Sequence, residues 1–330
     1  MLDHGGRLRA AAQQYAIPLA DWLDLSTGIA PYAWPLPEIS ADAWNRLPEV
    51  EDGLEAAARD YYGVASLLPV AGSQAAIQCL PRLQRAAQVG ILSPAYAEHA
   101  AAWRREGHRL QEISEGSVNR ALERLDVLVV INPSNPTGRR IERQQLLDWH
   151  ARLAARGGWL VVDEAFIDCT PEHSLAADSH LPGLIVLRSF GKFFGLAGIR
   201  LGFVLAEPEL LERLAEQIGP WSVSGPAREV ARVALGDTRQ QDLQRQRLLV
   251  DGLRLAVLLS SCGLPPAGGT SLFQLVLGEQ AGTLHEFLAR RGILTRLLAS
   301  PSGLRFGLPA DESGWQRLEQ ALQAFRQVSP

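Results

Sequence analysis

The chain has 330 residues, of which 47% are apolar and 21% are charged, and its formal net charge is −4. This composition fits a globular protein with a large buried core, and it lacks the basic surface that nucleic-acid binding requires. The sequence has neither an N-terminal apolar signal core nor a run of about 18 apolar residues that could span a membrane. It therefore predicts a cytoplasmic protein. Cys79, Cys169 and Cys262 show no paired spacing, which favours a reducing compartment and gives no metal site.

The first 40 residues are Pro-rich and irregular, and we expect them to pack on a smaller domain or on a partner subunit. A helical pattern follows over Glu49–Tyr62. Continuous apolar runs then alternate with helical patterns, which is typical of parallel strands covered on both faces. The runs predict strands at Val89–Leu92, Val127–Ile131, Trp159–Val162, Leu184–Leu187 and Leu201–Leu205, and helices at Glu98–Glu106, Arg143–Arg156 and Pro208–Gln217. Residues 41–220 thus predict a large α/β domain whose mostly parallel sheet is sandwiched by helices.

After Gly219-Pro220 the pattern changes to that of a smaller α+β domain over residues 221–330. A long helix is expected over Thr238–Ser260, and a final helix buries a stripe that includes Trp315 and Phe325. Ser313 and Gln316 have the spacing of a capping box for that last helix. The expected strands of this domain are Leu272–Leu277, Leu294–Leu297 and Leu304–Gly307.

The basic residues are unusual, because the chain contains 32 Lys and Arg residues and only one of them, Lys192, is a lysine. An arginine-rich protein can place positive charge anywhere without lysine. A guanidinium cannot, however, lose a proton and attack an aldehyde carbon as a primary amine does. A coding bias explains why lysine is scarce, but not why Lys192 lies among glycines directly after an apolar strand. We therefore predict a nucleophilic lysine.

Polar segments follow several of the predicted strands, where open parallel sheets bind their ligands. The Asn- and Pro-rich turn Asn132–Gly138 follows one strand, and Asp163 ends the next. Ala71–Ala76 forms a tight turn that opens a helix, and its Gly72 and Ser73 are suited to cradle a phosphate. Asp163 alone could equally cap a helix, and a Gly-Ser pair is also an ordinary cap. Together with the amine, they match the protein-side requirements of pyridoxal phosphate (PLP).

Three segments carry a resemblance to a known family. Asn132–Gly138, Asp163–Phe166 and Ser189–Gly202 resemble the corresponding motifs of the fold-type-I PLP enzymes in the class I/II aminotransferase family. The resemblance extends over roughly residues 45–310. It implies the PLP-transferase fold, PLP as cofactor, and a homodimer.

The resemblance also implies roles for individual residues. Lys192 would form the Schiff base and then move protons, and Asp163 would pair with the protonated ring nitrogen. Asn135 would donate to the 3-oxygen of the ring, and Tyr96 would lie against the ring face. Arg305 would bind the substrate carboxylate. The implied phosphate shell consists of Gly72, Ser73, Gln74, Ser189 and Arg200.

Two groups within the family compete as the closer relatives, the threonine-phosphate decarboxylases of cobalamin biosynthesis and the histidinol-phosphate aminotransferases. The N-terminal His4-Gly5-Gly6 and the segment Leu23–Pro31 resemble the decarboxylases. Phe166 stands where aminotransferases usually carry a tyrosine that bonds the 3-oxygen. We therefore expect decarboxylation of a small phosphorylated amino acid, L-threonine O-3-phosphate, with His4 as a residue that binds the substrate.

The chain also departs from these relatives. Gly28 and Ala30 replace two asparagines of the N-terminal segment, and Leu47 stands where many relatives have a tyrosine that reaches the partner's cofactor. Aminotransferase activity is the first alternative function. A catalytically silent PLP-fold binding module is the second, although it would have no chemical reason to keep Lys192, Asp163 and Asn135.

Overall fold

The computed structural model describes residues 4–328 and divides the chain into two compact units. The larger unit consists of residues 34–135 and 140–244. The smaller one combines residues up to 33, residues 136–139 and residues from 245 onward. The domain bounds predicted at residues 40 and 220 remain a prediction, and these units instead count residues 221–244 with the larger one. Among the described residues, no helix is both long and apolar enough to cross a bilayer.

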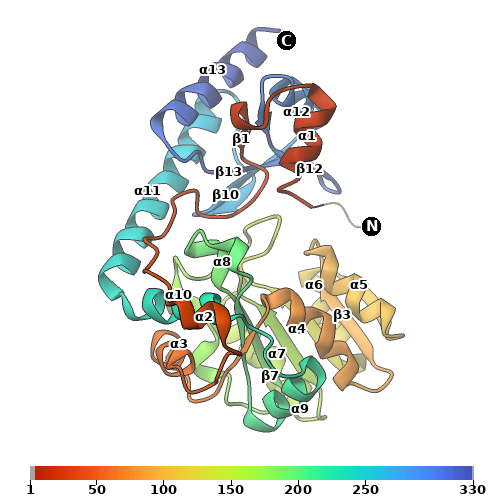
Figure 1. Ribbon diagram of the computed structural model, residues 1–330. Coiled ribbons are helices and arrows are strands. Elements are labelled where there is room, and N and C mark those ends of the chain that lie inside the picture. Colours follow the sequence, from red (N-terminus) through yellow and green to blue (C-terminus); the bar gives the residue numbers. More distant parts are fainter. Residues whose placement is uncertain (1–3, 329–330) are drawn as a thin grey trace. The chain divides into compact units, whose positions relative to one another are not determined.

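The larger unit is built on one seven-stranded sheet with the strand order β2-β8-β7-β6-β5-β3-β4. Figure 1 shows two of its strands, β3 and β7, among the helices of this unit. Strand β8 runs antiparallel to both of its neighbours, and the remaining pairs are parallel. This confirms the predicted mostly parallel sheet. Its strands are β2 (Leu68–Val70), β3 (Gln88–Leu92), β4 (Arg109–Ile113), β5 (Val127–Ile131), β6 (Trp159–Asp163), β7 (Leu184–Ser189) and β8 (Gly202–Leu205).

The continuous apolar runs form strands because both faces of the sheet are covered. Every residue of β5 and β6 is buried, although successive side chains of a strand point to opposite faces. On one face, Val129 and Val161 belong to a core cluster with two helix residues, Trp103 and Leu214. The helices of this unit are α2 (Ala41–Asn45), α3 (Leu54–Tyr62), α4 (Ser73–Cys79), α5 (Ala97–Arg105), α6 (Glu115–Ala121), α7 (Arg143–Ala154), α8 (Phe190–Phe193), α9 (Pro208–Ile218) and α10 (Gly225–Gly236).

The smaller unit contains an antiparallel four-stranded sheet, with the order β12-β13-β10-β9, and a parallel pair of short strands. The pair joins β1 to β11, so the N-terminal chain is part of this unit. The long helix α11 (Thr238–Ser261) begins in the larger unit and continues into this one. The other elements are α1 (Leu8–Tyr15), β1 (Leu23–Asp24), β9 (Gly268–Thr270), β10 (Phe273–Leu277), α12 (Ala281–Ala289), β11 (Ile293–Leu294), β12 (Arg296–Ala299), β13 (Ser302–Gly307) and α13 (Glu312–Val328).

The N-terminal stretch that was predicted to be irregular contains the helix α1. Two predicted helix starts were also wrong, for identifiable reasons. The expected helix over Glu49–Tyr62 begins only at Leu54, because Gly53 has a φ of 91° that a helix cannot continue. The capping box at Ser313 is not formed. Helix α13 already includes Glu312, and the Asp311 carboxylate accepts the backbone N–H of Gly314 at 2.8 Å instead.

Candidate active site

The carboxyl ends of neighbouring parallel strands bring the predicted polar segments together. Asp163, the last residue of β6, pairs with Ile131 of β5 on one side and Leu187 of β7 on the other. The backbone N–H of Asn132 donates to the Asp163 carbonyl at 2.9 Å. The Asn132–Gly138 turn therefore starts beside Asp163. Two polar segments far apart in the sequence thus meet at the carboxyl ends of neighbouring strands, where open parallel sheets bind their ligands.

The Asp163 side chain is buried and held from two directions. Its Oδ1 accepts the backbone N–H of Ala165 at 3.1 Å, and its Oδ2 lies 2.9 Å from Nε2 of His99 in α5. Asp163 and His99 are 4% and 1% exposed. The imidazole fixes the direction of the carboxylate and satisfies an oxygen that would be costly to bury alone. His99 was not among the predicted site residues, although its position in α5, three residues after Tyr96, is a signal that could have revealed it.

Lys192 lies in the short helix α8, directly after β7. Its Nζ is 5.7 Å from the ring centre of Phe166, which is carried by the loop after Asp163. Behind it, Phe190 and Phe194 stack with ring centres 4.1 Å apart, and Trp34 packs edge-on against Phe194 at 4.8 Å. This aromatic packing holds the lysine segment in place. Trp34, which was not among the predicted residues, thereby ties the first residues of the larger unit to α8 and the residue after it.

The predicted phosphate shell comes together around two glycines. A Cβ on Gly72 would lie 2.7 Å from Nη2 of Arg200, and a Cβ on Gly202 would lie 2.5 Å from the backbone nitrogen of Ser73. Ser189 pairs with Gly202 across β7 and β8. Because both glycines lack a Cβ, the Arg200 guanidinium packs against the backbone of Gly72, and the Gly202 backbone approaches that of Ser73. A guanidinium and backbone N–H groups are the donors that a phosphate ester needs.

Replacing Gly72 by alanine is expected to weaken cofactor binding at least about tenfold, because the new methyl group displaces the Arg200 guanidinium. Gly72 also has a φ of +74°, so its replacement strains the backbone by about 1–3 kcal/mol. Gly63→Ala is the control, since Gly63 has a φ of +65° but no atom within 4 Å of a Cβ. Titration of both variants with PLP separates the two effects. Equal PLP affinities of the two variants would show that Arg200 is not part of the phosphate site.

Tyr96 and Gln74 interact with each other. The Tyr96 hydroxyl donates to Oε1 of Gln74 at 3.3 Å, and Nε2 of Gln74 donates to Glu98 at 3.0 Å. The side-chain amide of Gln74 is therefore engaged by protein groups. Burial raises the pKa of Tyr96 to about 12, so its ring stays neutral at physiological pH. Its ring lies edge-on to His99, with the ring centres 6.3 Å apart.

Two hydrogen bonds from the Asn132 side chain hold the Asn132–Gly138 turn to the backbone of Ile141. The side chain of Asn132 accepts the backbone N–H of Ile141 at 2.8 Å and donates to the Ile141 carbonyl at 3.2 Å. These two bonds fix the loop that presents Asn135, which is half-buried. The role of Asn135 as a donor to the cofactor stays a prediction.

The remaining two predicted residues, His4 and Arg305, belong to the smaller unit. Arg305 of β13 donates to the Ser26 carbonyl at 3.1 Å, and the Ser26 hydroxyl oxygen accepts the backbone N–H of Gly6 at 2.8 Å. Ser26 thus brings the N-terminal His4-Gly5-Gly6 segment and Arg305 together. Burial lowers the pKa of Arg305 to about 10, with a smaller contribution from Arg296, so the guanidinium is still a cation at neutral pH.

The residues of the larger unit fit the needs of PLP. They supply one lysine amine, a buried and oriented carboxylate, and the Arg200 guanidinium, which packs against the Gly72 backbone at the start of α4. Among the described residues, no group of three His, Cys, Asp or Glu side chains could hold a metal ion.

Comparison with known proteins places the chain in the family that its motifs resemble. The family pattern described as aminotransferase class I and II matches residues 23–314, and the chain belongs to this family. A threonine-phosphate decarboxylase of Pseudomonas aeruginosa is 63% identical over 99% of both chains. Another, from a Sinorhizobium species, is 43% identical over 97% of both.

The fold also matches solved structures. A histidinol-phosphate aminotransferase from Sinorhizobium meliloti, solved in complex with pyridoxal-5'-phosphate, aligns over 100% of this chain and 96% of its own with a TM-score of 0.85. Its sequence identity is 18%, so this likeness concerns the fold alone. The predicted PLP-transferase fold is confirmed.

Proposed function

We propose that this protein is a PLP-dependent decarboxylase that converts L-threonine O-3-phosphate to (R)-1-aminopropan-2-ol phosphate and CO2, as a step of cobalamin biosynthesis in the cytoplasm. The observation that carries the proposal is the 63% identity, over nearly the full length, to a threonine-phosphate decarboxylase. The Lys192 and Asp163 arrangement supports the chemistry. The likeness to a histidinol-phosphate aminotransferase, at 18% identity, supports only a shared fold.

Bound PLP would supply an electron sink for the pair released when the bond from Cα to the carboxylate breaks. The chain contributes the surroundings of this step. The Asp163 carboxylate, held by His99, would favour a proton on the ring nitrogen. The Nζ of Lys192 carries the proton that replaces the lost carboxylate at Cα. Phe166 has no hydroxyl, so at this position the chain lacks the donor that aminotransferases usually have.

Selection among bonds depends on orientation, because the bond that breaks must lie perpendicular to the conjugated ring. The cationic Arg305 would bind the substrate carboxylate, with its guanidinium fixed by the Ser26 carbonyl. His4, at the start of the segment packed on Ser26, would contact the substrate phosphate. A catalytically silent binding module would have no chemical reason to keep Lys192, Asp163 and Asn135.

Two assays run side by side test the proposal. In the first, purified protein with PLP and threonine phosphate is followed for CO2 release. In the second, it is given histidinol phosphate and 2-oxoglutarate and followed for glutamate. We expect turnover in the first assay only. Turnover confined to the second would make the protein an aminotransferase, and PLP uptake with turnover in neither would favour a binding module.

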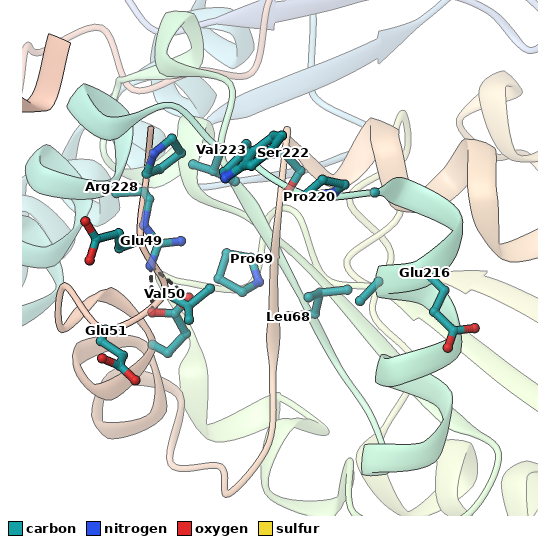
Figure 2. A pocket seen from close by; sticks show the side chains of 15 residues that line it. Glu49, Val50, Glu51, Leu68, Pro69, Glu216, Pro220, Ser222, Val223 and Arg228 are labelled. Carbon is teal, nitrogen blue, oxygen red and sulfur yellow. Dashed lines mark hydrogen bonds and ion pairs between the residues drawn. The ribbon is translucent and has the colours of Figure 1, made fainter. Parts of the chain in front are cut away.

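We also propose that the protein is a homodimer. The larger unit has a cavity of about 690 Å³ whose lining includes large apolar side chains that are exposed. Figure 2 shows Leu68 and Pro69 in the wall of this cavity, between Arg228 and Glu216. Val50 and Trp221, which also line it, are 73% and 60% exposed. None of the candidate cofactor residues lines it. Apolar side chains this exposed favour contact with a second copy of the chain.

Replacing Val50 by aspartate is expected to weaken the dimer at least about tenfold, because the contact would bury an unpaired charge. Sedimentation velocity over a range of protein concentrations measures the effect. Val257→Asp is the matched control, since Val257 is 69% exposed on α11 and lies in the smaller unit. A wild-type protein that sediments as a monomer at micromolar concentration would contradict the proposal.

A further inference from the structure

A buried ion-pair cluster lies next to the candidate cofactor residues and has no part in the chemistry described above. Its centre is Arg188 of β7, which is 2% exposed. One guanidinium nitrogen donates to Asp168 at 2.6 Å, and another donates to Glu164 at 3.3 Å and to Ser174 at 3.1 Å. Asp168 also accepts the Tyr61 hydroxyl at 3.1 Å. The two carboxylates are 4% and 0% exposed.

Stability alone is a poor explanation for this cluster. Removing three charges from water is costly, and well-packed apolar residues often replace such a triad without loss of stability. The cost is visible at Glu164, whose pKa is raised by burial against the lowering effect of Arg188. The Nε of Arg188 is in addition buried with no hydrogen-bond partner in the part of the chain that the structure describes. What a planar guanidinium fork does provide is a fixed geometry between two carboxylates.

The partners of Arg188 lie on segments that carry candidate site residues. Glu164 directly follows Asp163, and Glu164 and Asp168 flank Phe166 in the same loop. Arg188 directly precedes Ser189, and α8 with Lys192 follows.

The backbone reinforces the tie, because the N–H of Glu164 donates to the Leu187 carbonyl at 2.9 Å. The guanidinium therefore joins the loop after β6 to the end of β7. The loop after β6 and the segment at the end of β7 would contact different parts of the cofactor. The first carries Asp163, the partner of the ring nitrogen, and the second carries Lys192 and a residue of the phosphate shell.

We propose that Arg188 is a positioning residue, which locks the loop from Asp163 to Asp168 against the segment from Ser189 to Lys192 and so fixes the ring-nitrogen partner relative to the amine. The inference rests on the proposed function. A displacement of about 1 Å between such groups can cost on the order of 10²-fold in rate. Arg188 contributes this geometry without touching substrate or cofactor.

The test compares Arg188→Met and Arg188→Lys with Leu146→Ala, each as the PLP-loaded protein. Leu146 is fully buried in α7, so its truncation lowers thermal stability without touching the cluster. Two readouts are used besides thermal unfolding. Visible circular dichroism per bound PLP reports how asymmetrically the cofactor is held, and decarboxylation kinetics separate kcat from KM.

For Arg188→Met we expect a clear loss of the visible dichroism and a fall in kcat of about 10²-fold, with KM little changed. Arg188→Lys should recover part of both, because an ammonium can reach one carboxylate but not hold two. Leu146→Ala should keep both values at wild-type levels despite its lower unfolding temperature. If Arg188→Met changes only the unfolding temperature, as Leu146→Ala does, the cluster is merely structural and the inference is overturned.

Should Arg188→Met fail to fold, Asp168→Asn serves in its place, since it keeps the shape and removes one of the two charged partners. Like Arg188→Met, it should lower both the visible dichroism and kcat. Wild-type values of both would overturn the inference. Failure of the proposed function looks different. In that case the wild-type protein itself takes up no PLP or releases no CO2, and the inference falls with it.

Discussion

Replacing Lys192 by alanine is expected to abolish covalent attachment of PLP and to lower kcat by at least about 10⁴-fold. The reason is specific to this chain, because Lys192 is its only lysine and the variant has no other side-chain amine. Neither the covalent link nor the proton delivery to Cα can then be taken over by a neighbour. Visible absorption of the PLP-loaded protein and CO2 release from threonine phosphate measure the two losses.

Lys192→Arg is the control for this experiment, since it keeps a positive charge near Phe166 but offers no amine that can lose its proton at neutral pH. We expect it to lack the visible band as well. If the arginine variant turned over like the wild type, Lys192 would act only through its charge. If the alanine variant kept the band, the attachment site would lie elsewhere.

Replacing Asp163 by asparagine is expected to lower kcat by about 10³-fold while leaving the fold intact. The amide oxygen can still accept the backbone N–H of Ala165, and the amide NH2 can donate to Nε2 of His99 in the tautomer that leaves this nitrogen unprotonated. The change in volume is small, so stability should change by only about 1 kcal/mol. What is lost is the negative charge that favours a proton on the ring nitrogen. Steady-state kinetics and thermal unfolding of the same preparation separate the two effects.

Asp126→Asn provides a matched control, because Asp126 lies just before the opposite end of β5 and accepts the backbone N–H of Gln88 at 2.7 Å. It should turn over at the wild-type rate. Near-normal turnover of Asp163→Asn would refute the role assigned to Asp163, whatever the state of the rest of the site.

Five of the seven strands in the sheet of the larger unit could be predicted because their signals are local. The other two, β2 and β4, were missed because β2 is only three residues long and β4 is mostly exposed and polar rather than a continuous apolar run. Val127–Ile131 is a strand with the predicted bounds, and the other predicted strands of the sheet differ by one or two residues at their ends. Predictions failed where one residue decides the outcome. Gly53 delays α3, and the predicted strand over Leu294–Leu297 is broken at Thr295, between β11 and β12. A buried Thr295 hydroxyl that contacts His285 at 2.9 Å marks this break.

The residues of the candidate site that could be predicted are likewise those with local signals in the sequence. Lys192 and Asp163 could be recognised from their own neighbours in the sequence, because strand ends and motifs are local. The contacts that orient them could not. His99 lies 64 residues from its partner Asp163, and Arg188 lies 20 residues from Asp168 and 24 from Glu164. Such pairs depend on which strands become neighbours in the sheet, and no periodicity in one sequence reports that.

The most direct test of the account is to reduce the PLP-loaded wild-type protein with borohydride, digest it and locate the pyridoxyl group by mass spectrometry. The account predicts a single modified peptide that carries the group on Lys192, with no modification in Lys192→Arg. A protein that leaves the reduction unmodified, or that carries the group only on its N-terminal amine, would contradict it.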